Sequence, residues 1–92
     1  MGFTKDGAIE AARKDLAKRL GVDKDSVEKV SVTDKDFPDM SLGAPVEDEM
    51  AAQMISTGWQ IELAVNGDTY EYRADKFHLR LVDFKGQNYV VD

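Results

Sequence analysis

The sequence predicts an α+β fold in which one N-terminal helix packs on a four- or five-stranded antiparallel β-meander sheet. Three observations lead to this prediction. The first twenty residues carry apolar side chains at helical spacing, and the second half of the chain alternates apolar with polar residues. In addition, Asn66-Gly67 separates two alternating runs with the residues of a tight hairpin turn. No repeat or linker divides the 92 residues, so we expect a single α+β domain over 1–92.

The helix is predicted over 7–20. Its apolar stripe consists of Ile9, Ala12, Leu16 and Leu20. These residues are three or four positions apart, which places them on one face of a helix. Asp6 has a side chain that can cap the first turn, and Gly21 can adopt the left-handed conformation that often ends a helix.

The middle of the chain is less regular. A turn at 23–26 leads to a predicted strand at 27–33. The stretch 34–49 contains both prolines and six acidic residues, so we expect one long irregular segment there. The run 51–57 is compatible with a short strand that leads to Gly58.

The last third is predicted to be β structure. Its expected strands are 59–65, 69–74, 77–82 and 89–91, joined by turns at Asn66-Gly67, Asp75-Lys76 and 85–88. The expected core is Ile9, Leu16, Leu20, Val30, Val32, Ile55, Trp59, Ile61, Leu63, Tyr72, Leu79 and Leu81. The opposite face carries charges of alternating sign, which favours cross-strand ion pairs on a partly solvated surface. These charged residues are Glu62, Glu71, Arg73 and Arg80.

The composition excludes several classes of function. A net charge of -6 argues against nucleic acid and against anionic membrane surfaces as partners. The absence of cysteine excludes disulfides and thiolate metal sites. No apolar run reaches the roughly eighteen residues of a membrane span, and the polar N-terminus is not a signal peptide. We expect a monomer without a cofactor, and the compartment stays open because a removed leader would leave the same sequence.

His78 is the candidate general base, since it is the one histidine of the chain. In the predicted strand 77–82 it alternates with apolar residues, so its side chain is expected to point away from the core, beside that of Arg80. No Gly-x-Ser-x-Gly motif or other nucleophile motif accompanies it. A solvated strand histidine is therefore the simpler interpretation, and no catalytic residue is assigned.

The acidic segment raises the question of a metal site. Its carboxylates are Asp34, Asp36, Asp39, Glu47, Asp48 and Glu49. Asp34, Asp36 and Asp39 are the weak candidates for calcium ligands, because calcium prefers oxygen donors. Phe37-Pro38 interrupts the ligand spacing of an EF-hand, and no central glycine follows. A solvated charged loop explains the same residues, so we assign no metal.

The segment 37–45 is the candidate for partner contact. Prolines stiffen it at both ends, and apolar residues stand in what should be a polar loop. The contact residues expected are Phe37, Pro38, Met40, Leu42 and Pro45. A rigid loop that presents an apolar side chain is also how a peptidase inhibitor binds, because rigidity lowers the entropic cost. The alternative is that these apolar residues pack under the loop on the sheet.

The same segment resembles a family of small, largely uncharacterised bacterial domains. Their pattern is aromatic-Pro-Asp, then Ser-Leu-Gly-Cys-Pro, then Gln-x-Ile-x-x-Gly-aromatic-x-Ile-x-Leu, then Tyr-x-Tyr. The matching residues are Phe37, Pro38, Asp39, Ser41, Leu42, Gly43, Pro45, Gln53, Ile55, Gly58, Trp59, Ile61, Leu63, Tyr70 and Tyr72. Ala44 replaces the cysteine of the pattern, so any disulfide at that position is lost.

The resemblance implies a domain of an exported protein or lipoprotein. It implies no particular activity. The layout of one helix followed by a meander is also similar to PepSY domains, which are associated with peptidase inhibition. Together these points predict a small non-enzymatic domain of unknown function that contacts a protein or peptide. The alternatives are an acidic calcium-binding or envelope-associated structural module and, less favoured by the residues, an enzyme.

Overall fold

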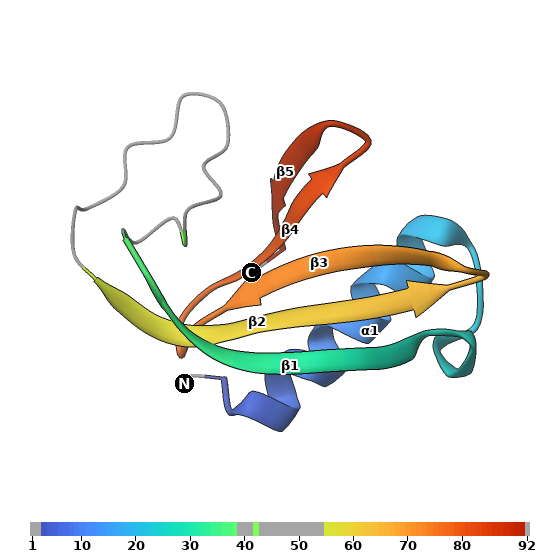
Figure 1. Ribbon diagram of the computed structural model, residues 1–92. Helices are drawn as coiled ribbons and strands as arrows, with labels where there is room; N and C mark the ends of the chain where they lie inside the picture. The colour runs from blue at the N-terminus through green and yellow to red at the C-terminus, as the bar shows by residue number, and fades with distance from the viewer. Residues whose placement is uncertain (1–2, 39–41, 43–54, 92) are drawn as a thin grey trace.

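A computed structural model describes residues 3–38, 42 and 55–91 of the chain. Its elements are α1 (Lys5–Leu20), the short 3-10 helix η1 (Lys24–Ser26), β1 (Glu28–Phe37), β2 (Ser56–Val65), β3 (Asp68–Ala74), β4 (Leu79–Phe84) and β5 (Gln87–Val90). The strands form one five-stranded antiparallel sheet in the order β1-β2-β3-β4-β5. Figure 1 shows α1 lying along one face of this sheet. The predicted α+β meander is therefore confirmed.

The helix starts earlier than the sequence pattern indicates. It begins at Lys5, and the Oγ1 of Thr4 caps it by accepting a hydrogen bond from the Gly7 N–H at 3.0 Å. The prediction of Asp6 as the cap is wrong because Asp6 already lies inside the first turn. Gly21 ends the helix with a φ of 68°, as expected. No helix among the residues described is long and apolar enough to cross a membrane.

The first strand is longer than predicted. β1 extends to Phe37, so four residues of the expected irregular segment belong to the sheet. Asp34 pairs with Trp59, and Phe37 pairs with Ser56. The run 34–36 is charged at every position, so apolar alternation could not reveal it as a strand. β2 begins at Ser56, and the remainder of the compatible run 51–57 lies mostly outside the described residues.

Two hairpin turns follow directly from their residues. Asn66 and Gly67 have φ values of 53° and 86°, and Lys85 and Gly86 have values of 54° and 83°. Two consecutive residues with positive φ form the turn whose twist matches that of antiparallel strands. These turns connect β2 to β3 and β4 to β5.

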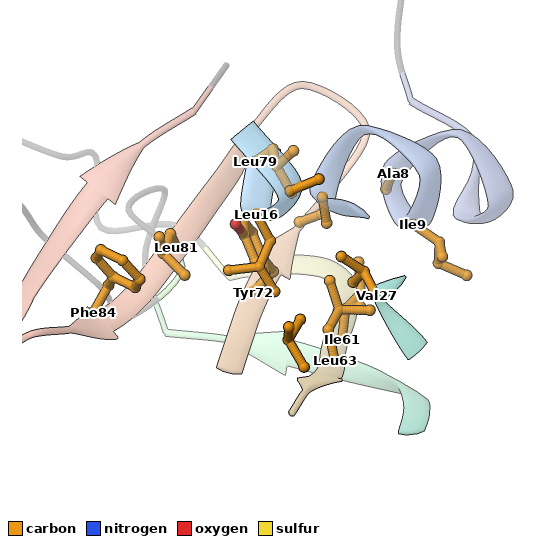
Figure 2. Close-up of a cluster of buried hydrophobic side chains, with 14 residues drawn as sticks. Ala8, Ile9, Leu16, Val27, Ile61, Leu63, Tyr72, Leu79, Leu81 and Phe84 are labelled. Atoms are coloured by element: carbon orange, nitrogen blue, oxygen red, sulfur yellow. The ribbon is translucent and has the colours of Figure 1, made fainter. Parts of the chain in front are cut away.

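The core lies between α1 and the sheet. Figure 2 shows side chains of α1 meeting those of the strands around Tyr72, which is fully buried. Of the predicted core, Ile9, Leu16, Ile61, Leu63, Tyr72, Leu79 and Leu81 are buried, and Leu20, Val32 and Trp59 pack against the cluster in part. Val30 and Ile55 are instead 50% and 75% exposed, so their assignment to the core is wrong. Val30 lies where the register with β2 shifts, and Ile55 lies before β2 begins.

A polar link joins the helix to the centre of the sheet. The hydroxyl of Tyr72 donates to Asp15 Oδ2 at 2.8 Å, and Arg19 Nε donates to the same oxygen at 2.7 Å. Burial and the neighbouring Asp15 carboxylate raise the pKa of Tyr72 far above its ordinary value. Arg19 also lies over the ring of Tyr89, with Cζ 4.6 Å from the ring centroid, which ties the β4–β5 hairpin to the helix.

The sheet face away from α1 differs from the expectation. Glu62 lies opposite Glu71, and Arg73 lies opposite Arg80, so like charges rather than opposite ones face each other across the strands. The ion pair forms along β3 instead, between Arg73 Nε and Glu71 Oε2 at 2.6 Å. Arg80 is buried rather than solvated. The four residues do share one face, but their predicted cross-strand pairing is wrong.

We predict that Leu16→Ala lowers the free energy of unfolding by about 3 kcal/mol, because it leaves a cavity under the sheet. Val30→Ala is the matched control and should cost less than about 1 kcal/mol, since Val30 is half exposed. Urea unfolding monitored by Trp59 fluorescence measures both. Equal losses in the two variants would contradict the position of the core.

Candidate functional site

The most organised polar group of the described residues is the carboxylate of Asp75. It is 3% exposed and lies in the connection between β3 and β4. Its Oδ2 accepts from Ser56 Oγ at 2.5 Å, and its Oδ1 accepts from the backbone N–H groups of Phe77 and His78 at 2.8 and 2.7 Å. His78 Nδ1 lies 3.0 Å from the same Oδ1. We call Ser56, Asp75, Phe77 and His78 the Asp75 network.

The network fixes the shape of the turn. The backbone N–H of Asp75 donates to the carbonyl of His78 at 3.0 Å, while the side chain of Asp75 holds two N–H groups of the same turn. An aspartate that bonds to the backbone two and three residues ahead stabilises a turn locally. The contact with Ser56 then attaches this turn to the start of β2.

Gly58 permits the same connection to approach β2. A Cβ added at Gly58 would overlap the carbonyl oxygen of Ala74 and lie 2.9 Å from the Cα of Asp75. Backbone atoms therefore occupy the space that any other side chain would need. Glycine is required here because of this close approach rather than because of an unusual φ.

The hydrogen bonds to Asp75 control its protonation. Burial raises the pKa of its carboxyl group, but the hydrogen bonds from Ser56, Phe77 and His78 more than offset that effect, so the pKa lies below its ordinary value. The carboxylate is thus ionised at neutral pH and can only accept hydrogen bonds. It follows that His78 Nδ1 carries the proton in the contact with Asp75.

The set of Ser56, Asp75 and His78 has the residue types of a hydrolytic triad but not its geometry. In a triad, histidine lies between the other two and takes the proton of the serine. Here Asp75 lies in the middle, and Ser56 donates to it directly while being 7% exposed. His78 lies just before β4 instead of within the predicted strand 77–82. The arrangement holds a turn in place, with Ser56 bonded to the carboxylate and not to the imidazole in the contacts described.

Beside the network is a hollow of about 300 Å³ lined by Ile55, Ser56, Thr57, Asp75, Lys76 and Phe77. We call it the Phe77 hollow. Ile55 and Phe77 are 75% and 69% exposed, and they are the two most exposed large apolar side chains of the described chain. Phe77 is in the turn that Asp75 fixes, so its backbone is held in position. Exposed apolar side chains that gather at one place are typical of contact surfaces.

The residues predicted to contact a partner have different environments. Phe37 and Leu42 are 1% and 0% exposed, so their side chains are not presented to a partner, and the expectation that they are is corrected. Arg73 holds both, because its Nη1 donates to the Leu42 carbonyl at 3.0 Å and its Cζ lies 5.9 Å from the Phe37 ring centroid. Pro38 is exposed, whereas Met40 and Pro45 lie outside the described residues.

Strand alternation explains why Phe37 is buried away from the helix. It pairs with Ser56 on β2. Because side chains alternate between the two faces along a strand, Ser56 lies on the face opposite to that of Ile61, which belongs to the core on the helix side. Phe37 therefore packs on the other face of the sheet, and the Leu42 carbonyl is held there by Arg73. For these two residues this agrees with the packing alternative that the sequence left open.

The weak metal candidates do not form a ligand set in the described structure. Asp34 and Asp36 are both on β1, where Asp34 Oδ1 lies 3.5 Å from Lys5 Nζ and Asp36 Oδ1 accepts from Thr57 Oγ1 at 2.8 Å. Asp39 lies outside the described residues. Over the described ranges, no three histidine or acidic side chains come together as a metal would require.

Sequence reasoning did not identify Ser56 and Asp75 as partners. The sequence predicts a tight connection at Asp75-Lys76, and an aspartate at such a position often bonds to the following backbone. The contact with Ser56 joins residues 19 positions apart and depends on the register of β2 against β3. No local pattern encodes that contact.

We predict that Asp75→Asn lowers the free energy of unfolding by about 2 kcal/mol at neutral pH, because it weakens charge-assisted hydrogen bonds to a buried group. The pKa of Asp75 is depressed in the folded state, so its stabilisation is present above about pH 4 and is lost as the pH falls through the folded pKa. The difference in the free energy of unfolding between the unaltered protein and Asp75→Asn should therefore shrink as the pH falls below about 4. Denaturant unfolding across pH measures it, and a constant difference would contradict the account.

We predict that Gly58→Ala destabilises the protein by about 2 kcal/mol, because the added methyl group displaces the backbone at Ala74 and Asp75. Thr57→Ala is the neighbouring control and should cost less than about 1 kcal/mol, since it removes one exposed hydrogen bond. Thermal unfolding by circular dichroism compares them. A Gly58→Ala protein as stable as the control would rule out the close approach.

Comparison with known proteins adds a family but no activity. A search of curated proteins and a search of solved structures each returned no match to the chain. A family model described as a domain of unknown function (DUF8738) matches residues 9–81. The matched region runs from within α1 to within β4 and includes Gly58, Asp75 and His78. It leaves out β5 and the turn before it. Because this family model matches most of the chain, the protein belongs to the DUF8738 family of domains of unknown function.

Proposed function

We propose that this domain is a non-enzymatic contact module that binds a protein or peptide segment at the Phe77 hollow. The observation that carries the proposal is the pairing of Ile55 and Phe77, which are strongly exposed and line the same hollow. The sequence placed the contact in the segment 37–45. The hollow is close to the start of that segment, because Phe37 pairs with Ser56 at the first residue of β2.

The rigidity of the hollow supports binding. Asp75 holds the backbone of Phe77 and His78, and Ser56 holds Asp75 to β2. A surface that is ordered before binding loses less conformational entropy when a partner arrives. The rings of Phe77 and His78 also lie edge to face, with centroids 6.5 Å apart, which is a favourable arrangement for an aromatic pair.

The chemistry of the lining favours an apolar group of the partner. Ile55 and Phe77 provide apolar surface, while Thr57 and Lys76 add polar groups at the same hollow. An aromatic side chain at the centre of a contact often contributes a large share of the binding energy. The partner is therefore expected to insert one large apolar side chain between Ile55 and Phe77.

The proposal that the domain is not an enzyme rests on the Asp75 network. Ser56 donates its proton to a carboxylate and is not in contact with the imidazole of His78 in the hydrogen bonds described. Of the apolar residues that an inhibitor could present as bait in this segment, Phe37 and Leu42 are buried, and Met40 lies outside the described residues. We therefore favour a contact at the hollow over inhibition through the 37–45 segment.

A display library of random peptides, selected on the immobilised full chain, tests the proposal. We expect selected peptides to share a large apolar residue and to bind Phe77→Ser and Ile55→Ser about tenfold more weakly than the unaltered protein. Val90→Ser is the matched control, because Val90 is also an exposed apolar residue at 49% but lies on β5. It should bind the peptides normally.

Thermal unfolding first establishes that all three variants fold. If the selected peptides bind Phe77→Ser as tightly as the unaltered protein, or if selection enriches no peptide, the hollow is not the contact site and the proposal fails.

A further inference from the structure

The outer edge of β1 is a second surface that the proposed contact at the hollow does not use. β1 is the first strand of the sheet and, within the described ranges, pairs with β2 alone. Eight of its ten residues are exposed. An edge strand presents backbone N–H and C=O groups that can pair with another strand. A shift of register between Lys29 and Ser31 bends the strand near its start, so the regular edge runs over 31–37.

We propose that an extended, basic peptide segment of another protein binds along residues 31–37 as an added β-strand. Binding by strand addition obtains affinity from backbone hydrogen bonds and specificity from alternate side chains. This inference goes beyond the proposed function, because it concerns another surface and does not depend on Phe77 or Ile55.

The charges along the edge identify the kind of peptide. Asp34 pairs with Trp59, and Asp36 pairs with Thr57, so both carboxylates are on the same face of β1. The Asp34 side chain is 77% exposed, and its contact with Lys5 at 3.5 Å is an exposed ion pair of little energy. Lys35 lies between them on the other face. An added strand therefore fits best when it carries two basic residues two positions apart, separated by a neutral or acidic residue.

The charge of the whole protein favours the same peptide. The net charge is -6, which attracts a basic segment and repels an acidic one. Charge complementarity of this kind increases the rate of association and excludes partners of the wrong sign. The negative charge thus disfavours pairing of the edge with an acidic strand and favours pairing with a basic one.

A second copy of the chain fits the edge less well in the registers that are centred on its charged residues. An antiparallel two-fold pairing centred on Asp34 would place this carboxylate opposite its own copy. A two-fold pairing centred on Lys35 would place the ammonium group of Lys35 opposite that of its own copy. Like charges directly opposite each other destabilise a pair of strands. A partner with basic side chains meets neither obstacle.

The test is an NMR titration of the isotope-labelled full chain with a synthetic peptide in which lysine and threonine alternate. A matched peptide with glutamate in place of lysine is the control. We expect the basic peptide to slow hydrogen exchange at alternate amides within 31–37, since an added strand bonds to every second residue. The acidic peptide should leave these amides unchanged.

Variants of the edge test the role of charge. Asp34→Asn together with Asp36→Asn should weaken binding of the basic peptide about fivefold, because two exposed charge pairs are lost. Lys35→Gln, on the other face, should not weaken it. Phe77→Ser should bind the basic peptide like the unaltered protein, which separates this surface from the hollow.

Three outcomes would overturn the inference. One is a set of NMR changes that centres on the Phe77 hollow and omits β1. Another is equal binding of the acidic and basic peptides. The last is a dimer in sedimentation experiments whose interface protects the amides of 31–37 without any peptide, because the edge would then belong to a second copy.

Discussion

The buried carboxylate of Asp75 is the interaction on which one end of this protein depends. It receives a hydrogen bond from Ser56 of β2 and two from backbone N–H groups of its own turn between β3 and β4, so a single side chain joins this turn to β2. Gly58 makes this possible, because only a residue without a Cβ lets the backbone at Asp75 come so close to β2. A charged group this buried is stable only because its hydrogen bonds replace those of water.

The same interaction fixes the backbone of the surface at which we propose that a partner binds. The turn presents Phe77 to solvent on a fixed backbone, and Ile55 lies at the same hollow. Tyr72 and Asp15 hold α1 to one face of the sheet (Figure 1). No residue of α1 lines the hollow, and α1 meets the edge of β1 in the exposed ion pair of Lys5 with Asp34. The two surfaces differ in chemistry, since the hollow exposes the apolar side chains of Ile55 and Phe77 beside polar groups, whereas the edge offers backbone groups flanked by aspartates.

Much of the fold follows from local sequence signals. The stripe of Ile9 and Leu16 and the turn at Asn66-Gly67 indicate a helix and a hairpin because each pattern is complete within a few residues. The charged end of β1 has no such pattern, because an edge strand with little burial does not require apolar alternation. The candidate site is harder to predict, since the contact of Ser56 with Asp75 arises from strand register, which sequence periodicity does not specify. The exposure of Ile55 depends on where β2 begins, which periodicity does not specify either.

The measurement that tests this account most directly is an NMR titration of the Asp75 side-chain carboxyl carbon in the folded protein. The account predicts a midpoint below the value of about 3.9 that an unperturbed aspartate shows, because Ser56, Phe77 and His78 donate hydrogen bonds to the ionised form. A midpoint at or above that value would mean that burial outweighs the hydrogen bonds. Asp75 would then not hold the turn as a carboxylate, and the account of the hollow as a rigid surface would be contradicted.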